Sequence, residues 1–150
     1  GIVINRPLQA CVLDIFDELD IVCDIDEGKF HMEHVLAGGP VERDKGFIIH
    51  DSDNRWESSI EVTSEITVCT SKTILQDIAT GSGPDNYLVA LGCAGWDAGQ
   101  LEREIGENAW LTAPASSELI FSKDYASKVH EAAAMLGVNM QQISPEAGHS

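Results

Sequence analysis

The sequence predicts a single α/β (α+β) domain over residues 1–150, in which helices pack on a mixed sheet. Segments with the spacing of strands and segments with the spacing of helices are interleaved along the chain, without an internal repeat or a linker. The chain is 43% hydrophobic and 23% charged, which supplies enough apolar material for one core.

The first part of the chain predicts a strand, a helix and a loop. The apolar run Ile2-Val3-Ile4 predicts a short buried strand over residues 2–5, which Arg6-Pro7 ends. Apolar residues then recur with helical spacing over residues 8–19, so we expect an amphipathic helix with an acidic outer face. Residues 24–34 are polar and predict a loop.

The middle of the chain predicts a helix between strands. The apolar run 46–50 indicates one strand, and alternation over residues 59–70 indicates one or two more. A helix is expected over residues 71–80, with its first serine as the N-cap and Gly81 as the C′ glycine. The continuous apolar run 87–92 is typical of a central strand that is covered on both faces.

The last part of the chain predicts two helices and two short strands. A helix is expected over residues 97–106, with an aspartate as its cap and Gln100 closing a capping box. Residues 110–113 and 119–121 predict strands, and residues 122–137 predict a final helix.

Charge excludes some partners. There are 25 acidic residues against 9 basic ones, so the formal net charge is −16, and the basic residues are scattered singly. Because affinity for nucleic acid and for anionic membranes rests on clustered Lys and Arg, we expect neither partner. No apolar run reaches the length of a membrane span, and no signal peptide is visible.

The cysteines bear on the compartment. Cys11, Cys23, Cys69 and Cys93 are widely spaced and form no C-x-x-C pair. This usage is typical of free thiols in a reducing cytoplasm rather than of a disulfide framework. We therefore expect a cytoplasmic protein.

Several short motifs are unusual in combination. They occupy residues 1–7, 38–41 (GGPV), 46–50 (GFIIH), 56–59 (WESS), 81–84 (GSGP), 90–96 (ALGCAGW), 99–102, 108–111 and 148–149. In this order they resemble the AlgH/YqgE family of bacterial proteins over essentially the whole chain. Members of that family carry extra residues upstream, and this chain begins at Gly1 directly in an apolar run, so we expect that an N-terminal segment is missing.

The resemblance implies a compact fold with a strongly curved, barrel-like sheet, but no known reaction. The family is labelled a transcriptional regulator through a genetic link to alginate production, which is an association and not a mechanism. Cys93 stands where the family pattern has an aromatic residue, so this chain lacks the tyrosine that could serve there as a ligand platform.

A nucleophilic site is one hypothesis. Cys93 follows a predicted strand and precedes a predicted helix, a position that activates a thiol, and His50 is the candidate base. The alternative interpretation is a tight turn built from small residues, with Cys93 merely packed.

Three further groups of residues have both a purely structural and a functional interpretation. The glycine turns 38–40 and 81–84 could offer backbone N–H groups to an anion, or simply form sharp turns. His31 and His34, with Glu33 between them, have a metal-binding spacing but lie in a polar loop, so we expect no metal and no other cofactor. His50 and residues 51–53 suggest acid–base chemistry, but a turn after a strand is favoured.

The sequence thus favours a non-enzymatic binding or regulatory protein that acts through a small molecule or a protein partner. Distinctive residues gather in turns, where binding residues are common, and Trp96 is the tryptophan that we expect to be partly exposed. The alternative is a small-molecule hydrolase or transferase that uses Cys93. The predicted binding residues are Gly38, Gly39, Pro40, Trp56, Ser58, Ser59, Gly95, Trp96 and Gln100.

Overall fold

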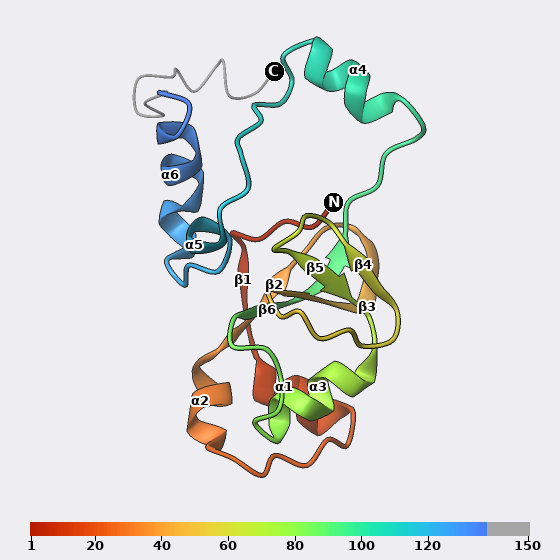
Figure 1. Cartoon of the computed structure of the whole chain (residues 1–150), viewed down its shortest axis with the longest axis vertical. Coiled ribbons are helices and arrows are strands. Elements are labelled where there is room, and N and C mark those ends of the chain that lie inside the picture. The colour runs from red at the N-terminus through yellow and green to blue at the C-terminus, as the bar shows by residue number, and fades with distance from the viewer. Residues whose placement is uncertain (138–150) are drawn as a thin grey trace. The chain divides into compact units, whose positions relative to one another are not determined.

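The structure, a computed structural model, describes residues 1–137 (Figure 1). These residues divide into two compact units, Gly1–Ala94 and the described part of Gly95–Ser150. The first unit contains β1 (Pro7–Cys11), α1 (Val12–Glu18), α2 (Glu27–Met32), β2 (His34–Ala37), β3 (Val41–His50), β4 (Ser59–Glu61), β5 (Thr67–Cys69), α3 (Lys72–Ala79) and β6 (Tyr87–Cys93). The second contains α4 (Gln100–Gly106), α5 (Ser117–Ile120), the 3₁₀ turn η1 (Tyr125–Ser127) and α6 (Lys128–Ala134).

The six strands form one mixed sheet in the order β1-β2-β6-β3-β5-β4. β2 and β6 are parallel, and the other neighbours are antiparallel. The α+β class and the mixed sheet are therefore confirmed. β1 and β4 are edges that do not pair with each other, so the sheet is open and the barrel-like curvature is not confirmed.

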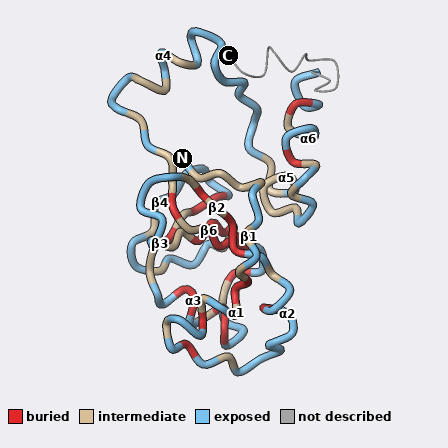
Figure 2. The backbone as a smooth tube through the Cα atoms, turned by 180° about the vertical axis from the view of Figure 1, so that it is seen from behind, coloured by how far each residue is buried: buried red, intermediate tan, exposed pale blue. Residues whose placement is uncertain are grey.

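β6 lies in the centre of the sheet and is buried on both faces. Val89 pairs with Ile48 of β3 in the core under the helices, while Leu88 and Ala90 point to the opposite face and are also buried. Figure 2 shows the buried residues concentrated in the sheet and in the facing sides of α1 and α3. Each fully buried Leu, Ile or Val contributes about 1.5–3 kcal/mol, so this strand and its neighbours dominate the core.

The helix predicted over residues 71–80 is confirmed as α3. The Ser71 hydroxyl accepts a hydrogen bond from the Thr73 N–H at 3.1 Å, which caps the helix. Gly81, with φ at 84°, ends it in the left-handed conformation that glycine adopts easily. Ile74, Leu75 and Ile78 form its buried face.

The start of the chain differs from the prediction. Residues 2–5 are not a strand; instead β1 begins at Pro7, which an edge strand tolerates as its first residue, and the predicted helix begins only at Val12. The pairing of β1 with β2 overrides the helical spacing of its apolar residues. Within the expected loop 24–34, α2 forms because the Asp26 carboxylate accepts from the Gly28 N–H and Phe30 is fully buried.

The second unit also differs. Residues 110–113 are irregular, and residues 119–121 fall at α5, which the Ser116 hydroxyl caps at the Leu119 N–H. α4 begins at Gln100 after Gly99, three residues later than expected, and the last helix is shorter than 122–137. The two strands predicted from the spacing of apolar residues in these short segments are therefore wrong, because none of residues 95–137 lies in a strand.

Within the described residues, the helices all fall short of the length and apolar character that crossing a membrane requires.

Candidate functional site

Two backbone segments, residues 38–39 and residues 92–93, pass unusually close to each other at the end of β6. A Cβ atom on Gly38 would collide with the carbonyl of Gly92, and one on Gly39 would collide with the backbone of Cys93. The Gly38 N–H already donates to the Leu91 carbonyl at 2.8 Å, so it is not free for an anion. The glycine turn is therefore explained by close strand packing.

A cavity of about 490 Å³ lies beside this crossing. We call it the arginine pocket, and its lining consists of Val3, Arg6, Leu8, Ala37, Gly39, Pro40, Arg43 and Leu91. Hydrogen bonds of 2.8 Å from the Val3 N–H to Gly38 and from the Ala37 N–H to the Arg6 carbonyl hold its N-terminal wall against β2. The predicted site residues Gly39 and Pro40 thus do line a cavity.

The charge of the arginine pocket opposes that of the chain. Its lining holds two arginines and no carboxylate, whereas the protein carries a net charge of −16. Both arginines are exposed, and neither takes part in the ion pair seen in the described residues, Arg55 with Glu61 at 3.5 Å. Guanidinium groups bind carboxylates and phosphates with two parallel hydrogen bonds. This arrangement suits a small anion.

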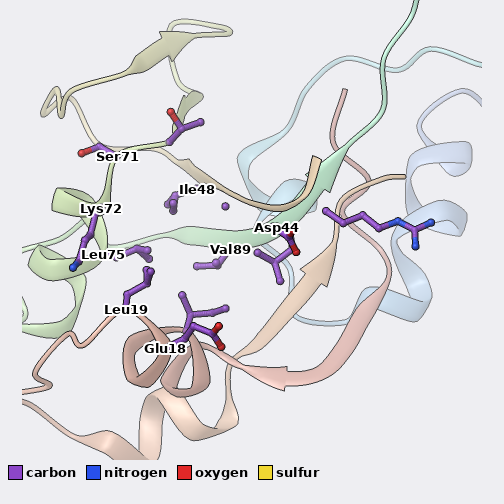
Figure 3. A pocket seen from close by; sticks show the side chains of 13 residues that line it. Glu18, Leu19, Asp44, Ile48, Ser71, Lys72, Leu75 and Val89 are labelled. Atoms are coloured by element: carbon purple, nitrogen blue, oxygen red, sulfur yellow. The ribbon is translucent and has the colours of Figure 1, made fainter. Parts of the chain in front are cut away.

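A second cavity of about 500 Å³, the apolar pocket, lies between α1, α3 and the sheet (Figure 3). Leu19, the C-cap residue of α1, and Leu75 of α3 approach Val89 on the sheet. Exposed Glu18, Asp44 and Lys72 lie around them. The remaining lining residues are Ile15, Arg43, Gly46, Ile48, Thr70, Ser71 and Leu91. Its volume falls within the range of small-molecule sites.

The two pockets adjoin, since Arg43 and Leu91 line both. Leu91 pairs with Ala37 of β2 on one side and with Gly46 of β3 on the other. Because paired residues share a face, Ala37, Leu91 and Gly46 belong to one face of the sheet. The arginine pocket and the apolar pocket are therefore neighbouring parts of one surface.

The predicted residues Trp56, Ser58 and Ser59 lie elsewhere. Trp56 packs edge-on against His50 with 5.1 Å between ring centroids, at the opposite end of the ten-residue β3 from Gly39. Since Gly39 lies against Cys93 and His50 pairs with Tyr87, six residues away on β6, the two regions are about 20 Å apart along the sheet. The Trp56 indole N–H donates to the Asp77 carboxylate at 2.7 Å, which makes Trp56 a packing anchor.

His50 is fully buried, and its environment favours the neutral ring. Nδ1 accepts from the Ser52 N–H at 3.1 Å, which places the proton on Nε2. Nε2 is buried without a hydrogen-bond partner among the described residues. Burial lowers the pKa of His50, Arg55 lowers it further, and Asp51 opposes both.

The structure does not bring His50 and Cys93 together. His50 pairs with Tyr87, and Cys93 lies six residues further along β6, about 20 Å away. No helix follows Cys93 directly, because α4 begins only at Gln100. The dipole and the base that motivated a nucleophilic Cys93 are thus both missing from its surroundings in the described chain.

Gly95, Trp96 and Gln100 belong to the second unit. Trp96 is partly exposed, as expected, but Trp56 is partly exposed as well and Trp110 is 48% exposed, so exposure does not single out Trp96. Trp96 packs edge-on against Trp110 at 5.9 Å between centroids. The Gln100 amide oxygen accepts from the Asp97 N–H at 3.0 Å, which is the reciprocal contact that the capping box predicted. Gly95 has open space around it.

The remaining candidates have structural partners. Glu33 accepts a hydrogen bond from the Tyr87 hydroxyl; burial and then this bond raise the pKa of Tyr87. The His34 ring contacts the Leu8 carbonyl at 2.9 Å, and His31 lies 3.9 Å from the Cys11 sulfur. No group of ligands that could hold a metal ion occurs within residues 1–137.

The turns after His50 and α3 are likewise occupied. The Asn54 N–H donates to the Ser52 hydroxyl at 3.1 Å, and Asp51 accepts from the Asn86 amide at 2.8 Å, which is the favoured turn interpretation. The Gly81 and Ser82 N–H groups donate to carbonyls of α3 and its C-terminus, at 3.2 and 2.8 Å. They are therefore helix-ending groups.

Sequence reasoning missed Arg6 and Arg43. Each is an isolated basic residue, so neither formed part of a visible cluster. Arg6 directly precedes Pro7, which ends the predicted first strand, and Arg43 follows the glycine turn by a few residues. Their rarity in an acidic chain, next to a distinctive motif, was the available signal.

The fold and its cavities define an α+β protein whose candidate site is a pair of adjoining pockets on one face of an open sheet. The chain matches the model of the AlgH-like family, DUF179, over residues 1–141. It belongs to that family, which confirms the resemblance drawn from its motifs.

Relatives and solved structures agree. The chain is 44% identical over 149 residues to a UPF0301 protein of Alcanivorax borkumensis, covering 99% of this chain and 78% of the relative. It is 41% identical over 150 residues to a UPF0301 protein of Xanthomonas oryzae pv. oryzae, covering 100% and 79%. The solution structure of the AlgH protein from Pseudomonas aeruginosa is similar with a TM-score of 0.77 and 38% identity, covering 100% of this chain and 78% of that one. DIP2367 from Corynebacterium diphtheriae, at a TM-score of 0.64 and 16% identity over 100% and 74%, shows the shared fold alone.

Proposed function

We propose that this protein is a non-enzymatic binding protein for a small organic anion, which it holds in the arginine pocket. The observation that carries the proposal is the presence of both Arg6 and Arg43 in the lining of a cavity without carboxylates, in a chain whose net charge is −16. Apolar side chains complete the lining, which favours an anion with an apolar body. A regulatory effect would then run through this ligand or a protein partner, and not through nucleic acid.

The chemistry of the site supports binding rather than turnover. Two guanidinium groups can hold a carboxylate or phosphate, whereas the proposed nucleophile and base lie far apart on β6 and β3. The four cysteines are free thiols, which supports action in a reducing cytoplasm.

Titration calorimetry with octanoate and octyl phosphate tests the proposal. Because both arginines are exposed, we expect each one to contribute about 1 kcal/mol, or roughly fivefold in affinity. The double variant Arg6→Gln/Arg43→Gln should therefore bind at least tenfold more weakly. Arg55→Gln, which removes an exposed arginine outside the pocket, is the matched control and should bind like the wild type.

Two results would overturn the proposal. One is the lack of saturable binding of either anion to the wild type. The other is a folded double variant that binds as tightly as the wild type and the Arg55→Gln control.

A further inference from the structure

We propose, resting on the function proposed above, that the ligand is a linear amphiphile whose anionic head lies in the arginine pocket and whose apolar chain extends into the apolar pocket. The proposal rests on the adjacency of the two cavities, which share Arg43 and Leu91 in their linings. A compact anion would fill the first cavity alone and leave the second without a role.

The sheet gives the path of the chain. Ala37, Leu91 and Gly46 are paired neighbours on three adjacent strands and belong to one face. Neighbouring strands lie about 4.8 Å apart, so the distance from Ala37 in the arginine pocket to Gly46 in the apolar pocket is about 10 Å. An extended alkyl chain can cover that distance across Leu91.

Gly46 leaves this passage open. It is not among the glycines with positive φ, so its backbone does not require glycine. A Cβ atom built at this position meets nothing within 4 Å. Glycine at position 46 therefore matters for the space that it leaves and not for its backbone conformation. Any larger residue here would project into the apolar pocket.

The lining of the apolar pocket fits an uncharged tail. Its floor consists of aliphatic side chains from α1, α3, β3 and β6, and several of these belong to the buried core or pack against it. Its charged lining residues Glu18, Asp44 and Lys72 are exposed to solvent. The only charged group shared with the arginine pocket is Arg43, which stands where the head and the tail of the ligand would meet.

The test compares butanoate, octanoate and dodecanoate in titration calorimetry. Burial of methylene groups predicts that octanoate binds the wild type on the order of 100-fold more tightly than butanoate. In Gly46→Leu, octanoate should fall close to the affinity of butanoate, while butanoate binding, which reports an intact arginine pocket, should not change. Gly95→Leu places the same side chain in open space outside the pocket and should leave the series unaltered.

Nuclear Overhauser contacts provide a readout that needs no variant. The terminal methyl of octanoate should contact the methyl groups of Leu19 and Leu75 in the wild type. Arginine-dependent binding without chain-length dependence, without these contacts and without an effect of Gly46→Leu would overturn the amphiphile while leaving the anion site standing. Loss of all saturable binding would instead refute the proposed function itself.

Discussion

Stability below neutral pH should be limited by His50. The ring is neutral and fully buried, and its folded pKa is lowered below the ordinary value near 6.5. Above that value both the folded and the unfolded chain keep the imidazole neutral, so pH has no effect through this group. Below it the imidazole is protonated in the unfolded chain but stays neutral in the folded chain, so the free energy of unfolding falls as pH falls.

The size of this effect follows from proton linkage. The loss is at most about 1.4 kcal/mol per pH unit, and between pH 6.5 and 5.5 it integrates to about 1 kcal/mol while the buried ring stays neutral. Once the pH passes below the folded pKa, the loss stops growing. His50→Phe removes the titrating group and keeps an aromatic ring against Trp56, so its stability should lack this component.

Urea unfolding at pH 7.5 and 5.5 measures the effect. The wild type should lose up to about 1.4 kcal/mol more than His50→Phe between the two conditions. His34→Gln, at an exposed histidine, should behave like the wild type. Titration of the 25 acidic residues is common to all three proteins and cancels in the comparison. If His50→Phe and the wild type lose stability equally, the buried neutral imidazole is not the cause.

Two further substitutions test the packing that surrounds the site. Gly39→Ala places a Cβ atom into the backbone of Cys93, so we expect the free energy of unfolding, measured with urea, to fall by about 2 kcal/mol or more. Gly95→Ala, in open space, is the control and should change it by less than about 0.5 kcal/mol. Equal effects of the two substitutions would contradict the close approach of Gly39 to Cys93. Trp56→Phe removes the indole bond to Asp77 but keeps a ring on His50, so a loss of about 1–2 kcal/mol is expected in the same assay, and an unchanged midpoint would show that the bond adds nothing.

Local signals explain which elements could be predicted. The helix from Ser71 to Gly81 has a cap, an apolar stripe and a terminal glycine within one short segment. The strand at β6 needs only its own continuous apolar run. By contrast, residues 7–11 became a strand because they pair with β2, a partner that no local pattern reveals. Propensity yields where tertiary pairing decides.

The candidate site divides in the same way. The Gly38-Gly39-Pro40 turn was visible as a motif, and two of its residues line the arginine pocket. Arg6 and Arg43 were not visible as a pair, because they come from separate segments that meet only through β2 and β6. Trp56 was visible as part of a motif, but it lies at the other end of β3 from the glycine turn. The sequence could not show this, because motifs do not reveal which end of a strand they lie beside.

The open sheet has a practical consequence at β4. This three-residue strand is an edge, and Ile60 within it and Val62 just beyond it are 69% and 60% exposed. An unpaired edge can accept a strand from another molecule, although the shortness of β4 limits the hydrogen bonds that it offers. Mutual repulsion between copies that each carry −16 opposes such pairing, and concentrated salt removes that repulsion beyond about 3 Å at 1 M. Oligomers and fibres of this protein should therefore form in high salt before they form in dilute buffer.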